Sequence, residues 1–299
     1  MRLGLCCLFV EEPIRFRTTT AKALLALPPD ERVPAVSRLV LLNADSLVAA
    51  VIAVDRLGIG AFRISSGLLP RATHPEVGYR LDDLPDSSAI RARLAEAGKI
   101  ARANRIRLSF HPDQFVVLSS PRPDVVDRSL AEVELHAELA ELVGAEMINL
   151  HVGGAYDDRE AAVDRFAAAF DRLSPSARSR LTLENDDTTW GPAEVADLCA
   201  RIGVPFVYDV HHHRCLPDRL DTDAATERCG AAWRELDRPP HFHVSSPRAG
   251  WGAGNPRPHA DFIDAADVPE AWLDLDCTVD VEAKAKELAV LRLTRDLAV

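Results

Sequence analysis

Eight short apolar runs, rich in Val, Ile, Leu and Phe, alternate with longer segments of helical spacing along the 299-residue chain. Such an alternation is typical of a parallel sheet whose strands are joined by helical crossovers. Eight repeats predict a closed (β/α)8 TIM barrel, an α/β fold that at this length forms a single domain over residues 1–299. The expected strands are Leu3–Val10, Gly60–Ser65, Arg105–His111, Glu146–His151, Arg180–Glu184, Pro205–Asp209, His241–Val244 and Thr278–Glu282, and the expected helices are Val33–Leu57, Ser88–Asn104, Pro123–Val143, Arg159–Leu173, Pro192–Ile202, Asp221–Leu236, Val268–Leu273 and Ala283–Leu297.

Histidines and carboxylates gather at the C-terminal ends of these predicted strands. In TIM barrels this end of the strands, with the loops that follow it, forms the active site, whereas strands used only for packing end in apolar or turn residues. The sequence therefore predicts that these side chains converge at one mouth of the barrel. The six strand-end residues are His111, His151, Glu184, Asp209, His243 and Glu282.

The mixture of imidazole and carboxylate groups is typical of a metal site. Such ligands suit Mn, Zn, Fe or Co, while sites built only from oxygen suit Mg and Ca. So many ligands would crowd one ion, so we expect two or three ions that share bridging carboxylates. Ions about 3.5–4 Å apart can hold both the attacking and the leaving oxygen of a phosphoryl displacement. The cluster therefore predicts hydrolysis of a phosphoester without a side-chain nucleophile, with Glu184, Glu282 and His243 as candidate catalytic residues.

The charge of the chain limits the kinds of nucleic-acid binding that it can support. A formal net charge of −11 at pH 7 counts against a nonspecific nucleic-acid binder, because phosphate contacts draw mainly on Lys and Arg. Bound cations would offset part of this charge, and the basic side chains need to cluster on only one face. Eight arginines fall near predicted strand ends or in the loops that follow, namely Arg15, Arg17, Arg63, Arg71, Arg80, Arg122, Arg248 and Arg257.

The N-terminal segment and the cysteines point to a cytoplasmic protein. The apolar start of the chain lacks a basic region followed by a small-residue cleavage site, and no uninterrupted apolar run reaches the ~18 residues that a membrane span needs. The six cysteines have no CxxC spacing, so we expect isolated thiols and not a disulfide framework or a zinc ribbon. We expect no membrane association and no organic cofactor; the sequence leaves the oligomeric state open, with a monomer favoured.

Nine sequence fragments, in one order along nearly the whole chain, resemble the UV damage endonucleases. They are RLGLCCLFVEEPIRFRTTT, FRISSGLLP, THPE, LSFHPDQFVVLSSP, NLHVGGAY, LTLENDD, HVSSPR, HAD and VEAKAKE. The resemblance implies the barrel shared with the endonuclease IV class of abasic-site nucleases. It also implies a nick immediately 5′ to cyclobutane pyrimidine dimers and 6-4 photoproducts in double-stranded DNA. The implied cofactor is Mn2+, as two or three ions, with Zn2+, Co2+ or Mg2+ as alternatives.

The resemblance also assigns roles to individual residues. In the family, a glutamine and the aromatic that follows it probe the helix at the lesion, and here these are Gln114 and Phe115. An aromatic face can stack in the gap left by extruded bases, and an amide can pair with orphaned base edges. Other expected DNA contacts are Leu5, Arg63, Arg71 and Arg248. The implied metal ligands are His111, His151, Glu184, Asp209, His212, His243, His259 and Glu282, with His241 and His74 as less certain companions.

Two positions depart from the family pattern. Family members usually carry a lysine two residues before the seventh-strand histidine, a position able to hold a modified, anionic amine; this chain has His241 there. Strand alternation puts His241 and His243 on the same side, so His241 can still approach the metals, as a neutral ligand or as a barrel-interior histidine. At Leu5 some relatives carry an aromatic that helps to hold the lesion, and leucine stacks less strongly.

Two further histidine assignments follow from spacing. After Asp209, strict alternation favours His211 and His213, whereas the family spacing of Asp, two residues and then His selects His212. A strand that ends at Asp209 and then turns would make this spacing natural. We prefer His212 and treat His211 as a supporting group. His136 lies in a charged amphipathic segment, so we expect it on the surface.

Three other functions fit parts of this pattern. An abasic-site endonuclease of the same barrel class would keep the ligands but probe a missing base. A sugar isomerase or epimerase would use fewer ligands and no aromatic probe, and its substrate would suit the acidic charge better. A noncatalytic damage-binding protein would have lost part of the metal site, against which the complete set of three carboxylates argues.

Overall fold

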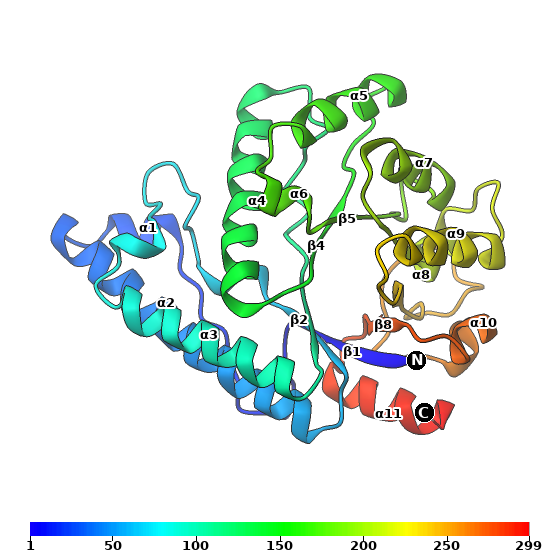
Figure 1. The fold of residues 1–299 in the computed structure, drawn as a ribbon, viewed down its shortest axis with the longest axis horizontal. Helices are drawn as coiled ribbons and strands as arrows, with labels where there is room; N and C mark the ends of the chain where they lie inside the picture. The colour runs from blue at the N-terminus through cyan, green and yellow to red at the C-terminus, as the bar shows by residue number, and fades with distance from the viewer. Residues whose placement is uncertain (299) are drawn as a thin grey trace.

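Eight parallel strands form a closed barrel, in sequence order, in the computed structural model, which describes residues 1–298 (Figure 1). The barrel closes because β1 pairs with β8 as well as with β2, with Leu3 beside Val279 and Leu5 beside Phe62. The predicted TIM-barrel fold is confirmed. The strands are β1 Arg2–Cys6, β2 Ala61–Ile64, β3 Arg107–Phe110, β4 Met147–His151, β5 Leu181–Glu184, β6 Phe206–Asp209, β7 His241–Val244 and β8 Thr278–Val281.

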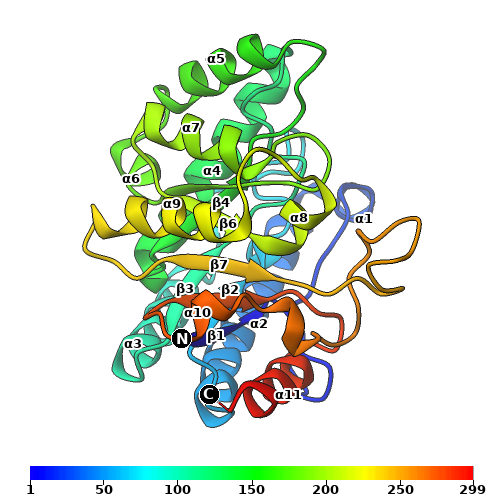
Figure 2. The same cartoon turned by 90° about the vertical axis from the view of Figure 1, so that its right-hand side faces the viewer.

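Helices surround the barrel on its outside (Figures 1 and 2). Their ends follow local sequence signals: α4 begins with a proline in its first turn and ends at Gly144, whose φ of 71° is a left-handed cap, and α7 repeats this pattern with Pro192 and Gly203. The α-helices are α1 Ala21–Leu25, α2 Pro29–Arg56, α3 Ser87–Ala103, α4 Pro123–Val143, α5 Arg159–Phe170, α6 Pro175–Arg178, α7 Pro192–Ile202, α8 Val210–Cys215, α9 Thr222–Arg234, α10 Glu270–Leu273 and α11 Glu287–Leu297, with short 3-10 turns η1 Ser66–Leu68, η2 Leu81–Asp83 and η3 Ala265–Asp267.

Many element boundaries differ by a few residues from the sequence prediction, and the short helices α1, α6 and α8 were not predicted. The first strand ends at Cys6 and not at Val10, because Cys7 takes a left-handed φ of 66° that turns the chain out of the sheet. The expected helix Val268–Leu273 starts only at Glu270, since Pro269 directly precedes it. The short helix α8, in place of a simple turn, follows Asp209 and was not predicted.

Helix α2 is long and apolar enough to cross a membrane by length and composition, yet half of its most apolar window is buried inside the fold. Its buried face carries Val40, Leu47 and Val54 at helical spacing, and α2 packs against α3 and β2. This burial is typical of the core helix of a barrel.

His136 is fully buried and not on the surface, which corrects the prediction from the sequence. It shares the inner face of α4 with Val133, Ala137 and Ala140. Its ring meets Phe110 edge-on at 5.3 Å, and its Nδ1 lies 2.8 Å from the carbonyl oxygen of Glu132. Glu134 and Glu138 lie on the opposite face of the same helix, whereas Glu132, one turn earlier, has its Oε1 3.7 Å from His136 Nδ1. Composition alone does not separate these faces, which is why it misplaced His136.

Strand alternation separates a polar barrel interior from an apolar outer wall. On β7, His241 and His243 face inward, while Phe242 stacks at 4.3 Å on Trp272 of α10 in the helical layer. On β1, Gly4 is the inward residue, because its Cα faces Asp280. Leu5 therefore points outward and is fully buried beneath the helices, which corrects its predicted role as a DNA contact.

We expect Gly4→Ala to lower the free energy of unfolding by about 1–3 kcal/mol, because overfilling a packed interior forces its neighbours to shift. A methyl group at Gly4 would collide with the Asp280 carboxylate and lie 3.2 Å from the Cβ of Ala61. Urea denaturation followed by circular dichroism measures the change. The control is Gly252→Ala, where nothing lies within 4 Å of the added methyl group, so stability should change by no more than about 0.5 kcal/mol. Equal midpoints for the two variants would show that Asp280 moves aside freely.

Candidate metal centre

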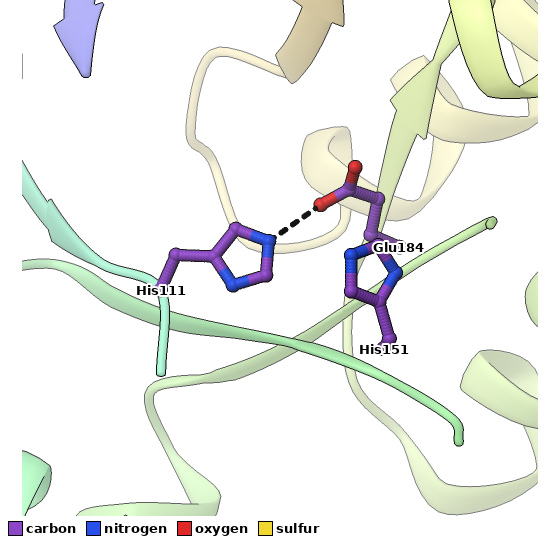
Figure 3. Close-up of side chains that lie close together, drawn as sticks. All are labelled: His111, His151 and Glu184. Atoms are coloured by element: carbon purple, nitrogen blue, oxygen red, sulfur yellow. Dashed lines mark hydrogen bonds and ion pairs between the residues drawn. The ribbon is translucent and has the colours of Figure 1, made fainter. Parts of the chain in front are cut away.

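The carboxylate of Glu184, at the end of β5, is the centre of the strand-end cluster. It is fully buried, and its Oε2 accepts a hydrogen bond from Asn149 Nδ2 at 2.5 Å and lies 3.0 Å from His111 Nε2. Its Oε1 lies 3.0 Å from His243 Nδ1 and 3.3 Å from His212 Nδ1. Figure 3 shows how His111 and His151 converge on this carboxylate from neighbouring strands.

Asp209 ends β6 and begins α8. Its Oδ1 accepts a hydrogen bond from the backbone N–H of His212 at 2.7 Å, so it caps the helix, and its Oδ2 lies 3.5 Å from His212 Nδ1. The helical turn thereby brings His212 to the cluster, as preferred from the spacing. His213 instead bonds the Tyr208 hydroxyl at 2.7 Å, and His211 Nε2 lies 3.2 Å from the carbonyl oxygen of Arg257.

Glu282, which follows β8, closes the other side of the cluster. Its Oε1 lies 3.4 Å from His243 Nδ1, and its Oε2 lies 3.7 Å from His259 Nδ1. Arg63 pairs with this carboxylate at 2.6 Å and is only 11% exposed. The inward direction of Arg63 does not agree with its predicted contact to DNA, and it makes Arg63 a fixed positive charge inside the barrel.

His241 and Asp280 form a second buried group beneath the cluster. His241 Nε2 lies 3.3 Å from Asp280 Oδ2, and the same oxygen lies 3.6 Å from Nε2 of His243. Asp280 was not predicted from the sequence, although alternation with Glu282 on β8 was the signal that could have found it. Since His243 faces Glu184 with its other nitrogen, Asp280 is placed to orient that imidazole.

His74 lies apart from this cluster, in the loop after β2. Its Nδ1 accepts from the backbone N–H of Glu76 at 3.2 Å, and its side chain lines a cavity of about 790 Å³. Gln114 and Phe115 of the loop after β3 line the same cavity, and 76% of the Phe115 surface is exposed. Arg71 also lines it, while Arg248 is exposed in the loop after β7. A DNA-contact role for Gln114, Phe115, Arg71 and Arg248 stays a prediction.

The electrostatics of the cluster fit bound cations. Burial raises the pKa of Asp209 to about 7, with Glu184 adding to the rise. Burial lowers the pKa of His243, but the carboxylates of Glu184 and Glu282 outweigh this effect and raise it to about 9. A proton on His243 thus supplies positive charge that the buried carboxylates demand, and divalent ions would supply the same charge in its place.

Unpaired polar atoms mark where such ions would bind. Among the described residues, Glu184 Oε1, Asp209 Oδ2, His151 Nδ1 and both ring nitrogens of His243 are buried without a hydrogen-bond partner. Burying such atoms unpaired is costly, so they fit metal coordination. Three groups have ligand atoms within 4.8 Å of one another: His111, His151 and Glu184; Glu184, Asp209 and His243; and His241, His243 and Asp280. Glu184 belongs to two of them, as expected of a bridging carboxylate.

We expect Glu184→Gln to weaken binding of divalent ions by at least about 100-fold, because the change removes the charge shared by two of these ligand groups. Inductively coupled plasma mass spectrometry after equilibrium dialysis against Mn2+ measures the bound metal. Glu235→Gln is the control, since Glu235 is exposed at the C-terminal end of α9. Equal metal content in the two variants would refute the central position of Glu184.

The family model, a curated relative and one solved structure point to the same family. The model of the family described as UV-endonuclease UvdE matches residues 1–299. A UV DNA damage endonuclease of Bacillus velezensis is 32% identical over 301 residues, covering 98% of this chain and 91% of that protein. The crystal structure of SacUVDE is similar with a TM-score of 0.84 and 28% identity, covering 100% of this chain and 98% of that one. Endonuclease IV from Thermus thermophilus shares the fold, with a TM-score of 0.61 and 18% identity over 100% of this chain and 99% of that one.

Proposed function

Because this chain belongs to the UV-endonuclease UvdE family over its whole length, we propose that it is a metal-dependent endonuclease that incises double-stranded DNA immediately 5′ to cyclobutane dimers and 6-4 photoproducts. The observation that supports this proposal most strongly is the Glu184 cluster, in which one buried carboxylate is surrounded by a histidine that follows β3 and by histidines of α8 and β7. We propose Mn2+ as the native ion, as two or three ions.

The residues of the cluster have distinct parts in the proposed reaction. The ions, when bound, would supply Lewis acidity and neutralise charge at the scissile phosphate. The residues that would hold them are His111, His151, Glu184, Asp209, His212, His243, His259 and Glu282. Glu184 and Glu282 each lie close to more than one histidine, and both lie close to His243, so they link the ligands into one cluster. Arg63, fixed against Glu282 at 2.6 Å, balances the charge of that carboxylate inside the barrel.

Recognition of damage is proposed to use the exposed loop after β3. A photodimer weakens stacking and pairing, so it lowers the few kcal/mol that unstacking a base step costs. Phe115 is the most exposed of the large hydrophobic side chains, and Gln114 stands beside it over the same cavity. An aromatic so exposed is unfavourable in water, and it gains contact when it enters a gap in the base stack. A small sugar does not require an aromatic side chain that projects this far into solvent, so the exposure of Phe115 favours a DNA substrate.

We expect the Mn2+-loaded protein to nick a duplex oligonucleotide that carries one cyclobutane dimer, with a single cut directly 5′ to the lesion. Denaturing gel electrophoresis reads the cut, and an undamaged duplex, together with Glu184→Gln, provides the controls. Cutting of a duplex with an abasic site but not of the dimer would move the protein to the abasic-site class. No cutting of any duplex with Mn2+, Zn2+, Co2+ or Mg2+ would contradict the proposal.

Phe115→Ala should lower kcat/KM on dimer-containing DNA by about 5- to 150-fold, because stacking of one base on an aromatic contributes about 1–3 kcal/mol. Leu42→Ala, which removes an exposed side chain from the outer helix α2, should leave kcat/KM unchanged. Steady-state nicking of the dimer duplex measures both variants. A Phe115→Ala protein as active as the Leu42→Ala protein would remove Phe115 from damage recognition.

A further inference from the structure

The loop after β7 forms a projecting arm beside the metal centre. Pro247 and His259 form an antiparallel bridge, the backbone N–H of Arg248 donates to the carbonyl of Pro258 at 2.7 Å, and that of Ala260 donates to Ser246 at 2.8 Å. The two sides of the loop are therefore paired at its base, and residues 249–257 form its tip. Figure 2 shows this loop, in orange, extending beyond the C-terminal end of β7.

Trp251 is held rigidly at this tip. Its indole N–H donates to Asp267 Oδ1 at 2.8 Å, and Asp267 is itself buried and held by the Ser246 hydroxyl and by Arg214 at 3.0 Å. These contacts fix the ring, yet 38% of its surface remains exposed. An exposed aromatic whose direction is already fixed loses little conformational entropy when it stacks on a ligand.

The ring of Trp251 borders the metal centre. It lies 5.2 Å from the ring of His211, which in turn lies 5.0 Å from the ring of His259, a candidate ligand. In the closed barrel of eight strands, β7 is four strands from β3, so the loop with Trp251 stands on the opposite rim from Phe115. The metal centre therefore lies between two exposed aromatic side chains.

The charge around Trp251 suits an anionic polymer. The guanidinium of Arg214 lies 5.5 Å from the indole ring and is paired with Asp267 at 3.0 Å, so it contributes a cation–π contact more than free charge. The exposed Arg248 and Arg257 of the same arm supply the positive charge, with Arg257 3.7 Å from the carboxylate of Asp187. Arg257 donates from Nε to the carbonyl of Asp187 at 3.1 Å, which directs it along the rim. Aromatic rings interleaved with arginines are the usual components of a single-strand or unstacked-base binding site.

We propose that Trp251 is a nucleobase-stacking site, on which one base of the bound DNA stacks on the rim opposite Phe115. The inference rests on the proposed DNA endonuclease function. With an aromatic platform on either rim, the backbone between the two contacted bases passes over the metal centre. Trp251 then acts as a positioning residue that binds the substrate and does not take part in bond cleavage.

Intrinsic tryptophan fluorescence tests this site directly, because Trp190, Trp233 and Trp272 are at most 2% exposed and Trp251 is the accessible one. The dimer-containing duplex is titrated into the Glu184→Gln protein, which cannot complete the cut, and binding is followed in parallel by fluorescence anisotropy of labelled DNA. We expect DNA to quench the emission and to protect it from acrylamide. The same titration of a Glu184→Gln/Trp251→Phe protein should show no such change.

Kinetics of the otherwise wild-type enzyme supply the second readout. Trp251→Ala should raise KM for the dimer duplex by about 5- to 150-fold with kcat within about twofold, and Trp251→Phe, which keeps a stacking face, should recover most of the loss. Leu42→Ala is the control for loss of an exposed apolar side chain. Thermal unfolding of each variant shows whether the fold is kept. The fluorescence titration tests the site even if Trp251→Ala does not fold, because it observes Trp251 itself.

The outcomes separate this inference from the proposed function. If the wild-type protein nicks the dimer duplex while the Trp251 emission is unaffected by bound DNA and Trp251→Ala keeps the wild-type KM, the stacking site is refuted and the endonuclease function stands. If neither binding nor cutting of any duplex is found, both proposals fall. Quenching together with a raised KM supports the site.

Discussion

The burial of the Glu184 carboxylate is the constraint on which the rest of this barrel depends. Removing an anion from water costs several kcal/mol unless partners replace the lost hydration. The barrel provides Asn149 from below, and Asn149 is in turn fixed by the hydroxyl of Thr182 at 2.9 Å. The pairing of β4 with β5, which sets His151 beside Glu184 and Asn149 beside Thr182, makes this arrangement possible. A slip of one residue would point each of these groups into the apolar helical layer.

The same alternation explains the less expected features of the interior. Asp280 faces the barrel axis because it lies two residues before Glu282, which also does. The Asp280 carboxylate leaves no room for a side chain at its partner in β1, which is Gly4. Arg63 faces inward for the same reason and pairs with Glu282, so an arginine that looks available for DNA is used to balance charge. The interior is therefore a polar column, closed at its base by Arg107, which donates to the Thr278 hydroxyl at 2.8 Å and pairs with Glu146 at 3.0 Å.

The acidic composition is compatible with the proposed nucleic-acid substrate, because the charged side chains are unevenly distributed over the molecule. Many exposed arginines of the outer helices are paired with carboxylates, as Arg93 is with Asp45 and Arg201 with Asp164. The carboxylates of the centre are buried and suit cations, so they contribute little negative potential to the surface when ions are bound. The side chains exposed around the mouth include Arg248, Phe115 and Trp251, which can meet a nucleic acid, beside exposed carboxylates such as Asp113.

The sequence by itself determined the barrel and most of its candidate ligands, because strand alternation, helix caps and strand-end polar residues are local signals. Gly144 and Gly203 end their helices where left-handed φ values are needed, and His111, Glu184 and Asp209 stand where strands end. Tertiary structure decided the direction of side chains whose neighbours are distant in sequence. Leu5 and His136 are buried by helix packing, Arg63 is turned inward by a carboxylate 219 residues away, and Trp251 is oriented by Asp267. Local patterns carry no information about such long-range contacts, because the free energy that orients these groups comes from partners that only the closed barrel brings together.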